Sequence, residues 1–556
     1  MSRPHRIVFT NNRFKVGKIL SKLKKYLASG LLMTVVSSLL RTLAVSFNVY
    51  VSNKIGAEAL GLYTLLGSVY SFALTLATSG INLTTTRMVS DALGEKDTTK
   101  VRRSMTRCIL YSLSFGLLAS VLLFTLAEPL GTVALKDVRT VRSLRLLSVT
   151  LPLISVSSCL NGYFTSVRRV YKNASVQIFE QLFHIFACIV LLEMLIGDDM
   201  ESSCVALVLG GALAEMLSFS VSLILYVADK KKHLKKGRYS PPSAQITKKM
   251  LSIALPLALS AYFRSALLTI EHILIPVGIE KSGAKRSESL IAYGTLQSMV
   301  LPVVLLPASL IYSFSGLLIP ELAELKIQKN YTEIKYIASR VVHLALIFSI
   351  GVCGVMIFCS EELGAVLYSS EDAGRYIRLL APVIPIMYLD STVDAMLKGL
   401  GEQLYSMKVN IIDSLCSVFL VWFLIPRMGI DGYIAMIIIS EIFNATLSVI
   451  RLLSISKMKL QAAKWIVKPI FSIVASAYLS NLIFKVVHVG QNAKIALLIH
   501  IVTVAVLYLL LVCIFGALDK EDISWIVGFF KRKEEKRKFS SFLTKSKLKV
   551  DKDFLM

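Results

Sequence analysis

Charged residues are scarce in this sequence, because Asp, Glu, Lys and Arg make up only 18% of its 556 residues, against 55% hydrophobic residues. The mean hydropathy is +0.66, and a water-soluble domain cannot bury so large an apolar share. Apolar runs long enough to span a bilayer recur from Leu27 to Phe515. Only helices and closed barrels satisfy their backbone in hydrocarbon, and unbroken runs of this length exclude a barrel. The sequence therefore predicts an all-α integral membrane protein.

Motifs for catalysis or metal binding are also lacking. The sequence has no GxxxxGK[ST], HExxH or GxSxG pattern, and its seven histidines form no cluster along the chain. Its eight cysteines include no CxxC pair and fall in or beside apolar runs, so we expect them to be small core residues. These absences predict a protein that is not an enzyme and that holds no cofactor.

The net charge of +26 would suggest a nucleic-acid partner in a soluble protein, so its position along the chain decides its meaning. Basic clusters, Lys22–Lys25, Lys230–Lys236 and Lys531–Lys538, flank the apolar runs. The positive-inside rule explains this placement and puts both termini in the cytoplasm of a cell-membrane protein. We therefore expect no nucleic-acid partner, and we expect the basic termini to contact anionic lipids. Acidic pairs, Asp198-Asp199 and Glu361-Glu362, mark the opposite face.

The apolar runs and their polar interruptions predict about fourteen membrane-spanning helices. They are expected near residues 27–52, 60–87, 104–127, 141–167, 174–196, 203–228, 247–277, 289–320, 335–359, 376–400, 405–425, 431–455, 465–487 and 494–516. The longest interruption follows the sixth helix and contains Gly237, Pro241 and Pro242, as a linker would. The predicted organisation is a basic N-terminus (1–26), an N-lobe (27–228), a linker (229–246), a C-lobe (247–455), two further helices (456–516) and a basic tail (517–556).

Internal similarity supports two lobes. The segment Ser37–Arg41 in the first helix resembles Ser260–Arg264 in the seventh, and Ser79-Gly80 resembles Ser315-Gly316. The fifth and eleventh helices share a further pattern, an amide residue followed three positions later by a carboxylate, as Gln177 and Glu180 and as Asn410 and Asp413. Each repeat has an even number of helices, so the two six-helix lobes are expected to be parallel repeats around a central cavity.

Ionisable residues at membrane depth cost roughly 2.5–3.5 kcal/mol each, which makes them candidates for function. Arg41 and Arg264 occupy equivalent places in the two repeats, and the planar guanidinium suits phosphate oxygens. We therefore expect them to face one central cavity and to hold an anionic headgroup. The alternative is internal pairing with Glu271, Glu215 or Asp390.

The other candidate residues divide into two groups. Asp390, Asp394 and Lys398 follow one another at intervals of four in the tenth helix, where Asp394 and Lys398 could neutralise each other. Asp390 then remains for coupling transport to a proton, a sodium ion or the membrane potential, with Glu271 as a further candidate. The remaining candidates, all for substrate contact, are Arg87, Asn48 and Asn82.

Several segments also resemble a known family. Gly56–Tyr63, Ser68–Ser71, Leu76–Ile81, Asn161–Phe164 and Gln177–Gln181 are similar to the corresponding segments of polysaccharide exporters, above all the stage V sporulation protein B group. That group belongs to the superfamily of multidrug, oligosaccharidyl-lipid and polysaccharide exporters. The resemblance covers nearly the whole chain.

The resemblance implies a flippase for lipid-linked sugars, such as peptidoglycan or polysaccharide precursors, that works by alternating access. Relatives that flip the peptidoglycan precursor lipid II use cavity arginines, and Arg41 matches the one in the first helix. A lipid-linked sugar and enzymes of cell-envelope synthesis are the partners that this implies. Two alternatives stay open. A cation-coupled multidrug exporter should have an acidic residue in the first helix, and a membrane glycosyltransferase or polymerase should have a large outer loop.

Overall fold

The computed structural model describes residues 8–95, 97–195, 200–233, 243–486, 493–522 and 524–525. All regular secondary structure in these residues is helical, and they contain no strand. The first helices along the chain are α1 (Val8–Thr78), α2 (Ile81–Gly94), α3 (Thr98–Pro129), η1 (Leu130–Ala134), α4 (Thr140–Ser166), α5 (Val170–Leu195), α6 (Met200–His233) and α7 (Ser243–Lys281).

The remaining helices include several short pieces. They are α8 (Arg286–Gly294), η2 (Thr295–Val300), α9 (Leu301–Leu305), α10 (Ala308–Ile327), α11 (Tyr331–Phe358), α12 (Ser360–Tyr368), α13 (Glu371–Leu380), η3 (Ala381–Val383), α14 (Ile384–Gly399), α15 (Gln403–Ser456), η4 (Ala463–Val467), α16 (Lys468–Val486) and α17 (Ala493–Ile514). Of the sequence features discussed above, Asp198-Asp199, the linker residues 234–242 and the cluster from Lys531 lie outside the described residues.

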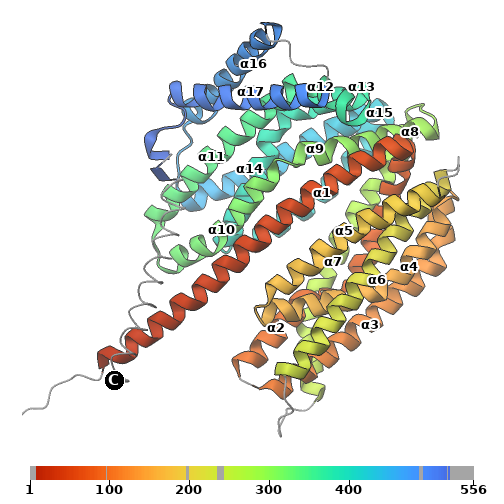
Figure 1. Ribbon diagram of the computed structural model, residues 1–556, viewed down its shortest axis with the longest axis vertical. Coiled ribbons are helices and arrows are strands. Elements are labelled where there is room, and N and C mark those ends of the chain that lie inside the picture. The colour runs from red at the N-terminus through yellow and green to blue at the C-terminus, as the bar shows by residue number, and fades with distance from the viewer. Residues whose placement is uncertain are drawn as a thin grey trace, which may run out of the picture.

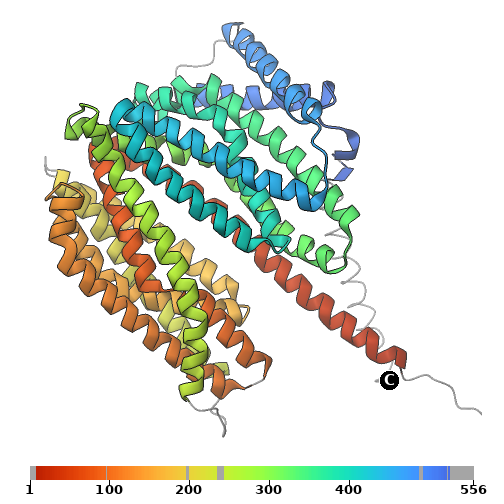
Figure 2. The same ribbon diagram turned by 180° about the vertical axis from the view of Figure 1, so that it is seen from behind.

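Twelve helices in the described part of the chain are long and apolar enough to cross a membrane. Two of these stretches, of 59 and 54 residues, each contain a glycine with non-helical backbone angles, Gly56 and Gly429. Figures 1 and 2 show α1 turning back on itself. Since a helix rises about 1.5 Å per residue, each half of these two stretches can cross about 30 Å of hydrocarbon by itself. Counted by halves, the structure has about fourteen crossings, and the predicted fold class is confirmed.

Two of the predicted helices contain marked breaks in the structure, besides the short 3-10 helix η3 within the one expected over 376–400. The helix expected over 60–87 breaks at Ser79 and Gly80, whose φ angles of 43° and 67° are left-handed and cannot continue a right-handed helix. The helix expected over 289–320 contains the π-helix η2 and a turn before α10, at Pro307. Proline has no N–H to donate to the preceding turn. Hydropathy detects the apolar run in both cases but not the backbone break.

The helices form two groups (Figures 1 and 2). Helices α2–α6 lie together in one group, and α9–α15 lie together in the other. Helix α7 packs against both α1 and α15, so it lies between the groups. Helices α16 and α17 pack on each other and on α11, at the edge of the second group. The predicted lobe boundaries, 27–228 and 247–455, stay a prediction.

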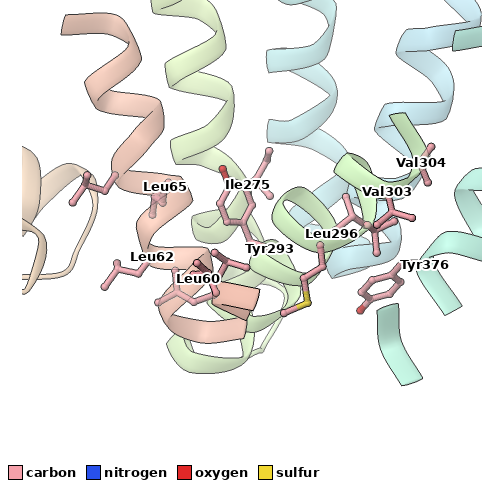
Figure 3. Close-up of a cluster of buried hydrophobic side chains, with 14 of the residues drawn as sticks. Leu60, Leu62, Leu65, Ile275, Tyr293, Leu296, Val303, Val304 and Tyr376 are labelled. Atoms are coloured by element: carbon pink, nitrogen blue, oxygen red, sulfur yellow. The ribbon is translucent and has the colours of Figure 1, made fainter. Parts of the chain in front are cut away.

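A buried apolar cluster joins the two groups near the turn at Gly56. Figure 3 shows side chains from the second half of α1, from α7, from the α8–α9 segment and from α13 meeting there. Leu60, Tyr293 and Leu296 are at most 2% exposed. Within this cluster a Cβ added to Gly61 would overlap the carbonyl oxygen of Leu290 on α8, so the two helices touch backbone to backbone. The structure is therefore closed at this end.

Candidate functional site

Two cavities lie on either side of α7. The larger one has a volume of about 700 Å³ and is bordered by the second half of α1 and by α4, α6, α7, α8 and η2. The smaller one, of about 190 Å³, is bordered by α7, α14 and α15. Helix α7 separates the two cavities, and consecutive residues of it line different ones. Ser265 lines the larger cavity, and Arg264 lines the smaller one.

The larger cavity is lined by apolar and polar groups and contains one carboxylate, Glu215 of α6. None of its lining residues in the described chain is Lys or Arg. The hydroxyl of Tyr70 lies 2.6 Å from that of Thr150, and Gln297 Oε1 accepts a hydrogen bond from the hydroxyl of Tyr433 at 2.8 Å. The ring nitrogen Nδ1 of His272 is 3.0 Å from the Tyr293 hydroxyl. This wall offers neutral hydrogen-bonding groups and a single acidic one.

The sequence alone does not predict this wall. Glu215 is expected there only as a partner for an arginine, and His272 and Gln297 are not among the predicted site residues. Glu215 could have been found as a carboxylate well inside the apolar span Met200–Lys232. His272 carries the same signal nearer the end of its predicted helix, whereas Gln297 is uncharged and gives none.

The smaller cavity collects most of the predicted coupling residues. Its lining consists of Arg264, Asp390, Ser391, Asp394, Lys398, Ser406, Asn410, Asn444 and Ser448. Lys398 Nζ pairs with Asp394 Oδ2 at 2.6 Å, as the spacing in the sequence predicted. Asp390 Oδ1 is buried and has no hydrogen-bond partner. An unsatisfied buried carboxylate oxygen is costly, which favours a role for Asp390 beyond packing.

Arg264 and Arg41 do not come together as expected. Arg264 lines the smaller cavity and interacts electrostatically with Asp413. Arg41 lines neither cavity, and its guanidinium carbon lies 5.3 Å from the ring centroid of Tyr312 on α10. In the described part of the chain, neither arginine has a carboxylate oxygen within 4 Å. Tyr312 is itself within electrostatic range of Asp390, so both cations lie toward the carboxylates of the second helix group.

The other predicted residues are dispersed. Asn48 donates a hydrogen bond to the backbone carbonyl of Ser298 in η2, which ties the first half of α1 to the second group. Glu271 is partly buried on α7 and interacts electrostatically with Asp413. Arg87 and Asn82 are exposed on α2. Of these residues, Asn48 thus has a structural contact that explains it without a substrate.

A ladder of hydroxyl contacts connects α7 to the second half of α1. Thr75 Oγ1 donates to Ser265 Oγ at 3.1 Å, and Thr269 Oγ1 donates to the carbonyl of Ser68 at 3.0 Å. The hydroxyls of Ser79 and Tyr262 also contact each other. Each hydrogen bond between membrane helices contributes only about 0.6 kcal/mol of stability on average. These contacts can therefore hold α1 and α7 together and still break when the two helices move apart.

Comparison with protein-family models gives a match to the polysaccharide biosynthesis protein family over residues 26–326, which is more than half of the chain. The protein belongs to this family. A second match, to the MatE family, covers residues 324–423. The resemblance found in the sequence is therefore confirmed.

Individual relatives agree with this membership. The chain is 24% identical over 511 residues to Stage V sporulation protein B of Bacillus subtilis, which covers 90% of this chain and 97% of that protein. The solved structure of the lipid II flippase MurJ in an inward closed conformation matches with a TM-score of 0.64 and 14% identity, over 86% of this chain and 98% of that one. An inward-facing multidrug resistance MATE family transporter of the MOP superfamily matches with a TM-score of 0.55 and 16% identity, over 76% and 96% of the two chains. These structures share the fold of this multi-pass membrane protein.

Proposed function

We propose that this protein moves a lipid-linked sugar, such as a peptidoglycan or polysaccharide precursor, across the cytoplasmic membrane by alternating access. The observation that carries the proposal is the cavity of about 700 Å³ bordered by α1, α4, α6, α7, α8 and η2, in a protein of the polysaccharide biosynthesis family. Its volume suits a small saccharide, and Tyr, Gln, Ser and Thr side chains on its wall can bind sugar hydroxyls. Enzymes that make the lipid-linked sugar would then act before the protein in the same process.

Arg41 is the cation that we assign to the headgroup. It stacks on Tyr312 with no carboxylate paired to it, so its guanidinium donors are available for phosphate oxygens. Arg87 and Asn82, both exposed on α2, would meet the substrate earlier, on the cytoplasmic side. Arg264 instead fits the coupling site, since it shares the smaller cavity with Asp390. The geometry thus favours different roles for the two repeat-equivalent arginines.

One observation favours a second candidate function, the export of cationic amphiphiles. The larger cavity has Glu215 and tyrosines on its wall and no basic side chain among its described lining residues. A carboxylate with aromatic neighbours suits an organic cation better than a diphosphate. The two functions depend on different residues, because a sugar phosphate would bind Arg41 and an organic cation would bind Glu215.

The test compares four variants in lipid vesicles, matched for the amount of inserted protein. For a lipid-linked sugar, Arg41→Ala should slow flipping by about 10-fold or more, because a hydrogen bond to a charged group is lost. Arg41→Lys should slow flipping less, because the charge remains. Arg145→Ala is the control, because that arginine pairs with Glu128 at 3.3 Å and is exposed. Normal flipping by Arg41→Ala would remove the headgroup role. The second candidate would be established by two results together. The unchanged protein would export a cationic dye but not flip the sugar, and Glu215→Gln would lose the dye export.

The proposal includes an orientation with both termini in the cytoplasm. It follows from the basic residues on the connections after even-numbered crossings, such as Lys96, Lys100 and Arg102. Tags at Gly237 and Met556 should report the cytoplasm, and a tag at Gly283, between α7 and α8, should report the outside. A cytoplasmic Gly283 would reverse the direction of transport that we propose.

A further inference from the structure

A sulfur, a nitrogen and a carboxylate oxygen converge where the α11–α12 junction meets α17. The three groups are the thiol of Cys359, the carboxylate of Glu362 and the imidazole of His500, and their ligand atoms all lie within 4.8 Å of one another. His500 Nδ1 is 3.1 Å from Glu362 Oε2 and 3.9 Å from Cys359 Sγ. Cys359 and Glu362 are three residues apart, and His500 comes from more than a hundred residues later. We propose that Cys359, Glu362 and His500 bind a divalent zinc-like metal ion.

The distances match what such an ion requires. Zinc binds sulfur at about 2.3 Å and nitrogen or oxygen at about 2.0–2.1 Å, so the ligand atoms of a tetrahedral site stand about 3.3–3.6 Å apart. The observed separations of 3.1 and 3.9 Å lie a few tenths of an ångström from this range. Small side-chain rotations would close these two differences, and the third pair, the Cys359 thiol and the Glu362 carboxylate, lies within 4.8 Å.

The surroundings hold the three groups in place. Cys359 is fully buried, and its backbone N–H donates to the carbonyl of Val355 at 2.9 Å. The ring of Phe484 lies 4.6 Å from the ring of His500, centroid to centroid, and covers it. The adjacent Glu361 pairs with Arg378 at 2.9 Å, which keeps that cation away from Glu362. Metal sites depend on such support for ligand orientation.

A fourth ligand has room. A cavity of about 250 Å³ adjoins the site and is lined by Glu362 and His500 together with apolar residues of α12, α16 and α17. The side chain of Glu362 is 49% exposed, so the carboxylate faces the outside of the protein. A site with three protein ligands and one open position is common for zinc, and a water molecule completes it. The opening also supplies a path for the ion.

The ligand types select the class of metal. A thiolate and an imidazole are soft or borderline ligands, which zinc accepts and which calcium and magnesium do not favour. The simpler reading is a hydrogen-bonded pair, His500 with Glu362, beside an unrelated cysteine. In a simple hydrogen-bonded pair, Cys359 could be replaced without effect on zinc binding, whereas a metal site requires its sulfur.

The site would act as a clamp. Cys359 and Glu362 belong to the second helix group, while His500 belongs to α17, which packs with α16 at the edge of that group (Figure 1). A bound ion would fix α17 against α12 and so restrict how the C-terminal helix pair moves relative to the rest. Metal binding would therefore stabilise the protein independently of any transported substrate.

The experiment uses the full-length protein purified in detergent and stripped of metal, with Zn²⁺ alone as the probe. We expect one Zn²⁺ per chain and a melting temperature that rises with zinc concentration. Cys359→Ser, Glu362→Gln and His500→Gln should each weaken zinc binding by about 10-fold or more. Cys353→Ser is the matched control, because Cys353 is a partly buried cysteine of α11 outside the trio, and it should bind zinc normally.

Cobalt gives a spectroscopic test of the sulfur ligand. Co²⁺ bound through Cys359 should produce a thiolate-to-metal charge-transfer band in the unchanged protein, and this band should be absent in Cys359→Ser. Absence of the band together with absence of zinc-dependent stabilisation would overturn the proposal and leave a His500–Glu362 pair. Zinc binding that all three variants retain would place the ion elsewhere and would equally overturn it.

Discussion

Ser440 donates a hydrogen bond to the carboxylate of Asp413 at 2.7 Å, within the second helix group. The first group has the same arrangement, since Ser218 donates to Glu180 at 2.6 Å. In both places a carboxylate on the fifth helix of a predicted repeat meets a serine on the sixth. The sequence pattern that relates Glu180 to Asp413 thus has a matching side-chain contact, which supports the repeat interpretation.

We predict that Ser440→Ala lowers the stability of the protein in detergent by about 1–2 kcal/mol, because a carboxylate inside the bundle loses its hydroxyl donor. Thermal unfolding of the purified protein is the measurement. Ser414→Ala is the control, since that hydroxyl donates only to the carbonyl of Asn410 within its own helix. Equal effects of the two substitutions would mean that the contact with Asp413 contributes nothing specific.

The close approach of α1 and α8 leads to a second prediction. A Cβ on residue 61 would meet the carbonyl of Leu290, so Gly61→Ala should separate the helices and destabilise the closed end by about 1–3 kcal/mol. Gly67→Ala, two turns later, should be neutral or slightly stabilising, because no heavy atom lies within 4 Å of its Cβ. The melting temperatures of the two variants decide the matter, and a neutral Gly61→Ala would contradict the tight packing.

Much of this architecture could be predicted from the sequence, and the reason is physical. Long apolar runs have one stable solution in lipid, so the helices and their approximate ends follow directly. The breaks at Ser79-Gly80 and in η2 were not predicted, because hydropathy reports the apolar run and not the backbone angles within it. The site was predicted only in part. Asp390, Asp394 and Lys398 lie on one helix and line one cavity, and their spacing in the sequence predicted that Asp394 pairs with Lys398.

The relation between Arg41 and Arg264 shows where this reasoning fails. Equivalent positions in two repeats share a helix and a depth, but the direction of a long side chain depends on its neighbours. Tyr312 is available to Arg41, whereas Arg264 lies beside Asp413 and Asp390. Repeat similarity therefore pairs the two positions in the sequence, but it does not determine what each side chain contacts.

A third prediction concerns pH. Asp522 follows α17 and has no exposed surface. Burial alone would raise its pKa, but the backbone N–H of Asp519, the adjacent His343 and the Arg340 guanidinium together hold the pKa below its ordinary value. Lys464 faces it as well. A carboxylate whose folded pKa is depressed stabilises the protein above its unfolded pKa, near 3.9, and this stabilisation is lost as the pH falls toward the folded value.

We therefore expect the melting temperature of the unchanged protein to fall as the pH drops below about 4, and to fall less in Asp522→Asn, which has no proton to gain. Near neutral pH the variant should be the less stable of the two, because Arg340 loses a charged partner. Glu521→Gln is the control, since Glu521 pairs with Arg340 at 2.7 Å but is 81% exposed. Parallel pH curves for Asp522→Asn and the unchanged protein would show that Asp522 does not govern this response.

The last prediction concerns the coupling of transport to an ion gradient. Asp390 and Asp394 lie one helical turn apart and line the same cavity, but only Asp394 has a cation, Lys398, at 2.6 Å. Asp390 Oδ1 has no partner, and Arg264 shares its cavity without an ion pair within 4 Å. A carboxylate that can gain and lose a proton or a cation at little structural cost is what coupling requires, and Asp390 meets that requirement better than its neighbour.

Asp390→Asn should therefore remove the dependence of transport on a proton or sodium gradient, while the amount of folded protein in the membrane stays close to normal. Asp394→Asn is the matched control on the same helix and in the same cavity. It frees Lys398 and should lower stability more than coupling. The measurement is substrate flipping in vesicles with and without an imposed gradient, for both variants at equal protein density. If Asp390→Asn keeps the full response to the gradient, the carboxylate is structural, and the partly buried Glu271 on α7 becomes the residue to test.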